Sequence, residues 1–445
     1  MEHATDYPVL RMDEWLECAA TDPEIAATFG RLYFAHGNTE FTAHRNGASF
    51  CSAACLPAYP LALWIAQSWW RLFYELKPIS DTHGWSAAHC MRFAGHGYLW
   101  PDVWLQTDGV CMDILARPYI ADGEDPIEYF PHESRGIPLD LMETCFSLFV
   151  DKVIERLDRT EPDLEKLWRE VLRERQDDAL SFQRTIEATL GYEPDGLSEQ
   201  EFQDLMKKGQ ALGKAHLLEA LAAFHQSGQS GRSGKTHNNE LKEILSFLSS
   251  AHAVRGRFNL PDLSHDTSPG NTLEPWELGR KLAYQLRKKA GITGKIDSKM
   301  LRDMLGLSEK SFNSIQAETE MPFSFGMKNA GSYTFIFHKD RMESRRFQAA
   351  RFIGDYCTSR VRQQDDTWLI LSDSTTFRQK AQLAFGAELL MPVRLITEHT
   401  GGNYTPAHVK KVAAEFEVSP VLAAAQLASH KLISPAEAEL YSYTS

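Results

Sequence analysis

The sequence predicts an α+β protein of several domains in which helices predominate. At 445 residues the chain is longer than one ordinary domain, and 43% hydrophobic residues suffice for more than one core. Apolar residues recur every three or four positions over long stretches, as they do in amphipathic helices. Short apolar segments bounded by Gly, Pro and Asp lie apart from these stretches and indicate strands. We therefore expect helices and strands to occupy largely separate regions.

Residues 1–135 are predicted to form an acidic, Trp-rich α+β domain. Their most apolar run, Tyr59–Leu76, is interrupted by charged residues such as Arg71 and Glu75. Such residues are costly inside a bilayer, so the run indicates a buried helix and not a membrane span. Further along, V-W-L-Q and V-C-M-D-I-L flank an Asp-Gly turn at Asp108, and this pattern predicts a β-hairpin.

Residues 136–226 are predicted to be a helical middle region. Apolar residues between Leu139 and Leu157 recur at helical spacing, and a Glu/Arg-rich amphipathic stretch follows them, so we expect three or four helices. Residues 227–274 are predicted to be a flexible Gly/Ser linker with a short helix and a loop. The stretch Gln226–Asn239 has no apolar residue whose burial could order it.

Residues 275–445 form the last predicted domain. It begins with the amphipathic helix P-W-E-L-G-R-K-L-A-Y-Q-L, followed by a second helical piece at 298–315 and the aromatic strand S-Y-T-F-I-F-H. Next come the stretch R-R-F-Q-A-A-R-F-I-G-D-Y-C from Arg345 to Cys357, the segment W-L-I-L, the helix F-R-Q-K-A-Q-L-A-F-G-A-E-L-L, and a final pair of helices.

The first residues, the cysteine content and the charge indicate the compartment and the kinds of partner to expect. The first residues show no positive segment followed by an apolar one, so we expect no secretory signal and a cytoplasmic protein. Seven cysteines are a sparse, odd set, and we expect reduced thiols. The net charge of −13 is concentrated before residue 275, which argues against wrapping of nucleic acid by the whole molecule.

The stretch Arg345–Cys357 has the frame of a metalloprotease helix. In a His-Glu-x-x-His helix, residues four apart lie on one face, so two imidazoles bind zinc while the Glu activates water. Together with F-G-A-E-L-L-M-P at Phe385–Pro392 and V-S-P-V at Val418–Val421, this stretch resembles the ImmA/IrrE family of metallopeptidase-like proteins. The resemblance implies a zincin-like domain over residues 275–445.

The residues that carry chemistry in that family are replaced here. Where the family has His-Glu-x-x-His, this sequence has Arg351, Phe352, Ile353, Gly354 and Asp355. Where the family has an acidic third ligand, it has Gln379. Arg351 has no lone pair to give a metal, and Phe352 cannot activate water. We therefore expect a catalytically inactive pseudo-metallopeptidase that holds neither zinc nor another cofactor. Because Arg351 and Asp355 are four residues apart on one helix, we expect them to form an ion pair in the place of the metal.

The resemblance also implies a role in regulation. Active members of the family control repressor-like proteins in stress responses and in phages or other mobile elements. An inactive copy would keep the groove and bind a protein partner there, such as a repressor, an antitoxin-like regulator or an active protease relative. The residues that we assign to this groove are Arg346, Arg351, Asp355 and Glu388.

Two alternatives remain open at the level of sequence. One is an active metallopeptidase with a relocated metal site, for which His338 and His399, or Cys51 and Cys55 with His44, are candidate ligands. The other is a DNA-binding transcriptional regulator. The segment Ile296–Ile315 has the rhythm of two helices joined at a glycine, although its second half has a single basic residue.

Overall fold

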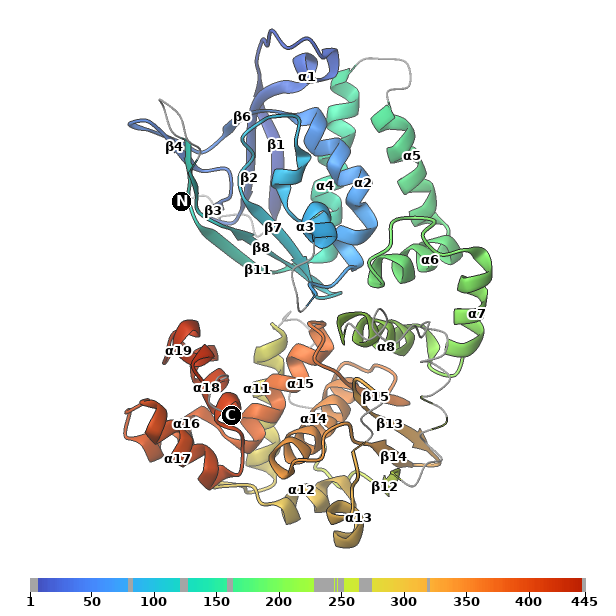
Figure 1. Cartoon of the computed structure of the whole chain (residues 1–445), viewed down its shortest axis with the longest axis vertical. Helices are drawn as coiled ribbons and strands as arrows, with labels where there is room; N and C mark the ends of the chain where they lie inside the picture. Colours follow the sequence, from blue (N-terminus) through green and yellow to red (C-terminus); the bar gives the residue numbers. More distant parts are fainter. Residues whose placement is uncertain are drawn as a thin grey trace. The chain divides into compact units, whose positions relative to one another are not determined.

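The computed structural model describes residues 7–78, 83–120, 127–157, 163–227, 244, 246, 252–263, 274–317 and 321–441. The chain divides into two compact units, Met1–Phe202 and Gln203–Ser445 (Figure 1). With 53% helix and 18% strand, the chain is a multidomain α+β protein, as predicted. The boundary between the units falls inside the predicted helical middle region, and most of the predicted linker at 227–274 lies outside the described residues.

The described strands of the first unit form three antiparallel sheets. The hairpin predicted at Asp108 is confirmed: β7 and β8 pair there, Gly109 has a φ of +84°, and the Asp108 carboxylate accepts hydrogen bonds from two backbone amides. The strands are β1 (Pro8–Trp15), β2 (Phe29–His36), β3 (Thr39–Glu40), β4 (His44–Asn46), β5 (Ser49–Cys51), β6 (Ala54–Pro57), β7 (Val103–Thr107), β8 (Cys111–Ala116), β9 (Tyr119–Ile120), β10 (Ile127–Tyr129) and β11 (His132–Pro138).

The Trp-rich run forms α2 (Ala58–Tyr74), which is buried along most of its length. It packs against α4, α5 and α6, where the rings of Trp69 and Trp168 lie 5.0 Å apart. The unit also contains α1 (Pro23–Thr28), α3 (His83–His89), the 3₁₀ helix η1 (Met91–Ala94), α4 (Leu139–Leu157), α5 (Asp163–Gln176) and α6 (Asp178–Thr189).

The predicted middle region contains more helices than we expected. Five described helices, α4 to α8, replace the expected three or four. One extra boundary lies at Asp177, whose carboxylate accepts hydrogen bonds from the amides of Ala179 and Leu180 and so caps α6 directly after α5 ends. Helix α7 (Glu199–Gly209) spans the boundary between the units, and α8 (Gly213–Ser227) belongs to the second unit.

The second unit combines one antiparallel sheet, in the order β12-β14-β13-β15, with helices that share its core. The predicted helices and strands of this region are present. They are β12 (Val254–Gly256), α11 (Pro275–Lys289), α12 (Ser298–Leu305), α13 (Glu309–Asn313), β13 (Ser324–Asn329), β14 (Ser332–Ile336), α14 (Met342–Val361), β15 (Trp368–Leu371), α15 (Phe377–Leu390), α16 (Val393–Thr400), α17 (Pro406–Phe416), α18 (Pro420–Ser429) and α19 (Pro435–Glu439).

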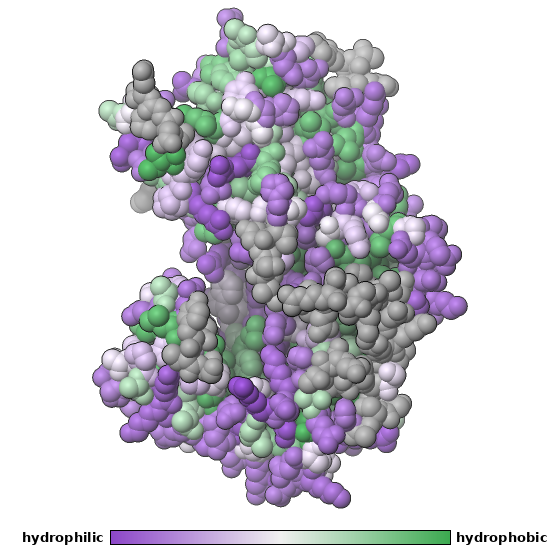
Figure 2. All heavy atoms as spheres, viewed as in Figure 1, coloured by the Kyte–Doolittle hydropathy of each residue, from purple (hydrophilic) through white to green (hydrophobic). Residues whose placement is uncertain are grey.

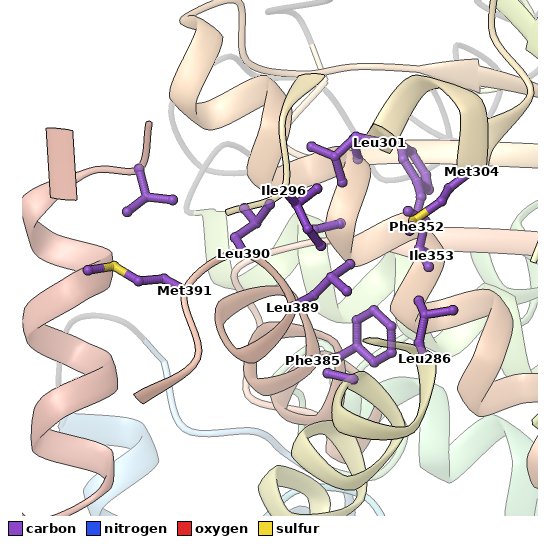
Figure 3. Close-up of a cluster of buried hydrophobic side chains, with 14 of the residues drawn as sticks. Leu286, Ile296, Leu301, Met304, Phe352, Ile353, Phe385, Leu389, Leu390 and Met391 are labelled. Carbon is purple, nitrogen blue, oxygen red and sulfur yellow. The ribbon is translucent and has the colours of Figure 1, made fainter. Parts of the chain in front are cut away.

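Glycines allow α11, α14 and α15 to approach one another closely. A Cβ atom on Gly279 of α11 would lie 2.2 Å from the backbone oxygen of Ala381 in α15. A Cβ atom on Gly354 of α14 would lie 2.7 Å from the ring of Phe385. Figure 3 shows Phe385 on α15 among the buried apolar side chains of these helices. Residues larger than glycine would force the helices apart.

The segment that suggested DNA binding folds as α12 and α13. Gly306 ends α12 in the left-handed conformation, with φ of +64°. Helix α13 has five residues, and its Phe312 is buried in the core. A helix this short offers little surface to a DNA groove, and DNA binding stays a prediction from the sequence pattern.

Hydrophilic side chains cover much of the visible face of both units, with hydrophobic residues in patches between them (Figure 2). No helix in the described parts of the chain combines the length and apolar character needed to span a bilayer.

Candidate functional site

A cleft of about 520 Å³ lies within the second unit, and we call it the α14 cleft. Its walls come from α11, α14, α15 and α18 and from the segments that follow β14 and β15. Most of the surface that lines it is apolar, from side chains such as Phe347, Leu383 and Leu422, and polar and charged side chains lie between them. This volume and lining are typical of sites that bind small ligands or short peptide segments.

Arg351 is the residue of the degenerate motif that lines this cleft. It is only 4% exposed, and its Nη2 donates to the backbone oxygen of Ser372 at 2.5 Å and to Oε1 of Gln379 at 2.7 Å. Its Nη1 lies 3.8 Å from the carboxylate of Asp373, which is well exposed. Burial lowers the pKa of Arg351 to about 10, so the guanidinium stays protonated at neutral pH.

Gln379, at the family's third ligand position, is fully buried and its amide is fully engaged. Its Oε1 accepts from Arg351 and also from the backbone amide of Ser372, at 3.0 Å. Its Nε2 donates to the backbone oxygen of Ile370 at 2.8 Å and to Oε2 of Glu219 at 3.1 Å. The glutamine therefore joins α15 to the end of β15 and to α8.

The predicted ion pair between Arg351 and Asp355 is wrong. Both carboxylate oxygens of Asp355 accept hydrogen bonds from Arg378, at 2.7 Å from Nε and 2.8 Å from Nη2. Arg378 lies in the first turn of α15 and satisfies the buried carboxylate with a two-pronged guanidinium contact, while Arg351 donates to Ser372 and Gln379 instead. Asp355 itself is fully buried and does not line the α14 cleft.

Phe352, which the predicted resemblance aligns with a catalytic glutamate, is a core residue. Its ring packs 5.0 Å from that of Phe335 and 5.4 Å from that of Phe337, and none of its surface is exposed. In Figure 3 it lies in the same cluster as Leu301 and Met304 of α12. The side chain at this position therefore points into the core of the unit.

Two more residues that we assigned to the groove lie elsewhere. Arg346 is fully buried and donates to the backbone oxygens of Ile296 at 2.6 Å and Glu417 at 3.2 Å, so it joins α14 to the segments before α12 and after α17. Glu388 accepts a 2.6 Å hydrogen bond from Nε2 of Gln426, and burial raises the pKa of its carboxyl. Neither residue lines the α14 cleft, because their side chains serve contacts between elements.

The residues that the predicted resemblance aligns with metal ligands do not fit a zinc ion. The first is a buried cation, and the carboxylate of Asp355 is already neutralised by Arg378. The amide oxygen of Gln379 is occupied by two donors. Zinc prefers imidazole, thiolate or free carboxylate ligands in tetrahedral geometry, and this set offers none of them.

The other candidate ligands form no metal site among the described residues either. His338 lines the α14 cleft, whereas His399 lies on α16 with its Nε2 3.4 Å from Glu415. In the first unit, His44 lies opposite Cys51 between β4 and β5, and both line a pocket of about 830 Å³ together with Cys55. Over the ranges that the structure describes, no group of three or more His, Cys, Asp or Glu is arranged to hold a metal ion.

Sequence reasoning missed several residues of the cleft: Trp276, Arg280, Lys339, Asp373 and Gln426. One signal was available for two of them. Lys339 follows the predicted aromatic strand and Asp373 follows W-L-I-L, and charged residues just beyond the ends of buried strands often gather at one edge of a sheet. The remaining residues lie on helices, and periodicity alone did not show which side of each helix would face the cleft.

No known protein family, no curated protein and no solved structure matches the chain. The resemblance to the ImmA/IrrE family therefore stays a prediction that depends on the sequence motifs.

Proposed function

We propose that this chain is a catalytically inactive, ImmA/IrrE-like regulatory protein that binds a segment of a protein partner in the α14 cleft. The observation that carries the proposal is the position of the cleft. It opens beside Arg351, the residue at the first ligand position of the degenerate motif, and most of its lining surface is apolar. Apolar grooves between helices commonly receive peptide segments.

The replaced motif residues support binding over catalysis. Arg378 holds Asp355, Gln379 holds Arg351, and Phe352 packs in the core. Each is used to join α14 to its neighbours, and no side chain among them is left to activate water. These contacts keep α14 and its neighbours rigid. A rigid groove favours binding because few side chains lose conformational entropy when the partner binds.

The decisive experiment fills the cleft without disturbing the core. Ala425 lies on α18, is exposed and lines the cleft, so Ala425→Trp should occlude it. Ala414 on α17 is also exposed but does not line the cleft, and Ala414→Trp is the matched control. Partners captured from the native host by the unmodified protein are identified and purified, and their affinities for the three proteins are measured.

We expect the tryptophan at position 425 to weaken binding of the true partner at least about tenfold, which corresponds to a loss of ~1.4 kcal/mol. The tryptophan at position 414 should leave the affinity unchanged. A partner that binds all three proteins equally well binds another surface, and the proposal would then be wrong.

An active metallopeptidase with a relocated metal site makes the opposite prediction. The purified protein would contain zinc in a fixed ratio to protein, and substitution of a candidate ligand such as His338 or Cys51 would remove it. Metal analysis of the native protein separates the two functions, because our proposal expects no stoichiometric metal.

A further inference from the structure

The guanidinium of Arg351 donates none of the hydrogen bonds that the structure describes to a carboxylate, although the charges of Asp373, Asp355 and Glu219 act on it. Its hydrogen bonds go to neutral oxygens, those of Ser372 and Gln379, and Nε of Arg351 is buried without a hydrogen-bond partner in the described structure. The carboxylate of Asp355 is taken by Arg378. Asp373 lies 3.8 Å away, is 64% exposed and also lies 3.4 Å from the ammonium group of Lys339. A buried cation without a close counter-ion is costly, and an arriving anion would relieve that cost.

The rest of the cleft also favours an anion. Besides Arg351, the lining includes Arg280, Lys339 and Lys380, against the carboxylates of Glu343 and Asp373. Nε of Arg280 is buried and has no hydrogen-bond partner among the described residues. This local excess of positive charge stands out in a chain of net charge −13. Charges of one sign in a cleft with apolar walls attract ligands of the opposite sign.

We infer that the α14 cleft recognises an apolar peptide segment that bears a carboxylate, and that this carboxylate replaces Asp373 as the ionic partner of Arg351. The apolar walls around Phe347 and Leu383 would take the flanking side chains. Asp373 then competes with the peptide carboxylate, because it makes a weak ionic contact with Arg351 while no peptide is bound in the cleft. The inference rests on the proposed function and specifies the chemistry of the partner.

The test uses two pairs of acetylated tripeptides with the full-length protein. One pair is leucine-phenylalanine-leucine with a free carboxyl terminus or with a terminal amide. The second pair, both with terminal amides, is leucine-glutamate-leucine or leucine-glutamine-leucine. The first pair tests a terminal carboxylate and the second a side-chain carboxylate, and affinities are measured by calorimetry or by NMR titration.

In at least one pair the acid should bind about tenfold more tightly than the amide, since a charge-assisted hydrogen bond is worth roughly twice a neutral one. Arg351→Met should abolish this preference. Asp373→Asn, an exposed substitution that should not affect folding, should tighten binding of the acid and leave the amide unchanged. Equal binding of acid and amide in both pairs, no binding of any peptide, or a preference that Asp373→Asn does not increase would each overturn the inference.

Failure of this inference is distinguishable from failure of the proposed function. If Ala425→Trp weakens binding of the native partner but no peptide shows a preference for the acid, the cleft binds a partner of different chemistry. If Ala425→Trp leaves partner binding unchanged, the proposed function falls, whatever the peptides show.

Discussion

Arg378 clamps Asp355 with two hydrogen bonds, from Nε to Oδ1 at 2.7 Å and from Nη2 to Oδ2 at 2.8 Å. The same Nη2 also donates to the backbone oxygen of Trp368 at 2.8 Å. One arginine thus joins α14, α15 and β15 beside the helix that carries the degenerate motif.

Removing the acid from this clamp should destabilise the protein strongly. Asp355→Asn leaves Arg378 without its counter-ion, and breaking a buried pair in this way typically costs about 3–5 kcal/mol. Asp373→Asn is the control, because its exposed carboxylate makes only long ionic contacts and should change stability by less than ~0.5 kcal/mol. Urea unfolding of both variants measures the difference. Similar small effects in both would show that the clamp contributes little.

The partner of Asp355 could not be found from the sequence. Oppositely charged residues four apart on one helix attract each other, and this rule, which applies within a single helix, predicted Arg351 as the partner. Arg378 lies 23 residues further along, on another helix, and its approach depends on how closely α14 and α15 pack. That closeness depends on Gly354 and Gly386, whose role is visible only once the helices are placed.

A glutamate at position 352, as in the His-Glu-x-x-His motif, should unfold the protein before it supplies any chemistry. Phe352→Glu would bury a carboxylate between Phe335 and Phe337, and we expect a loss of roughly 4 kcal/mol or more. Phe352→Leu keeps an apolar side chain and should cost about 1–1.5 kcal/mol. Thermal or urea unfolding compares the two. A folded and stable glutamate variant would mean that the side chain can reach solvent.

Local features of the sequence predicted much of the fold. Features that depend on how helices pack could not be predicted from the sequence. The hairpin at Asp108 and the helices α11, α14 and α15 follow from turn residues and apolar spacing, which act within a few residues. The site was predicted only in part. Arg351 lines the cleft as expected, but Arg346 is fully buried, and periodicity does not reveal which face of a helix in a crowded core receives a charged residue.

The close approach of α11 to α15 gives a further prediction. Gly279→Ala places a Cβ atom 2.2 Å from the oxygen of Ala381 and 2.9 Å from the nitrogen of Phe385, and backbone atoms cannot move aside cheaply. Alanine favours helix by about 1 kcal/mol over glycine, but overpacking costs ~1–3 kcal/mol, so we expect a net loss of stability. Gly294→Ala meets no atom within 4 Å and should be neutral or slightly stabilising. Equal stability of the two variants would contradict this packing.

Glu388 should make stability depend on pH. Burial raises the pKa of its carboxyl above the ordinary 4.5, although the hydrogen bond with the backbone amide of Val393 and the charges of Arg280 and Arg287 oppose the shift. A raised pKa in the folded state means that the protonated form is favoured there, so the contribution to stability is full below pH 4.5 and is lost as the pH rises through the folded-state pKa.

Glu388→Gln removes this titration while its amide oxygen can still accept the hydrogen bond from Gln426. We therefore expect the variant to gain stability relative to the native protein between acidic and neutral pH, with the gain levelling off above the folded-state pKa of Glu388. Urea unfolding across this range measures it. A difference between the two proteins that stays constant with pH, or that moves in the native protein's favour as the pH rises, would show that the arginines outweigh burial at this carboxyl.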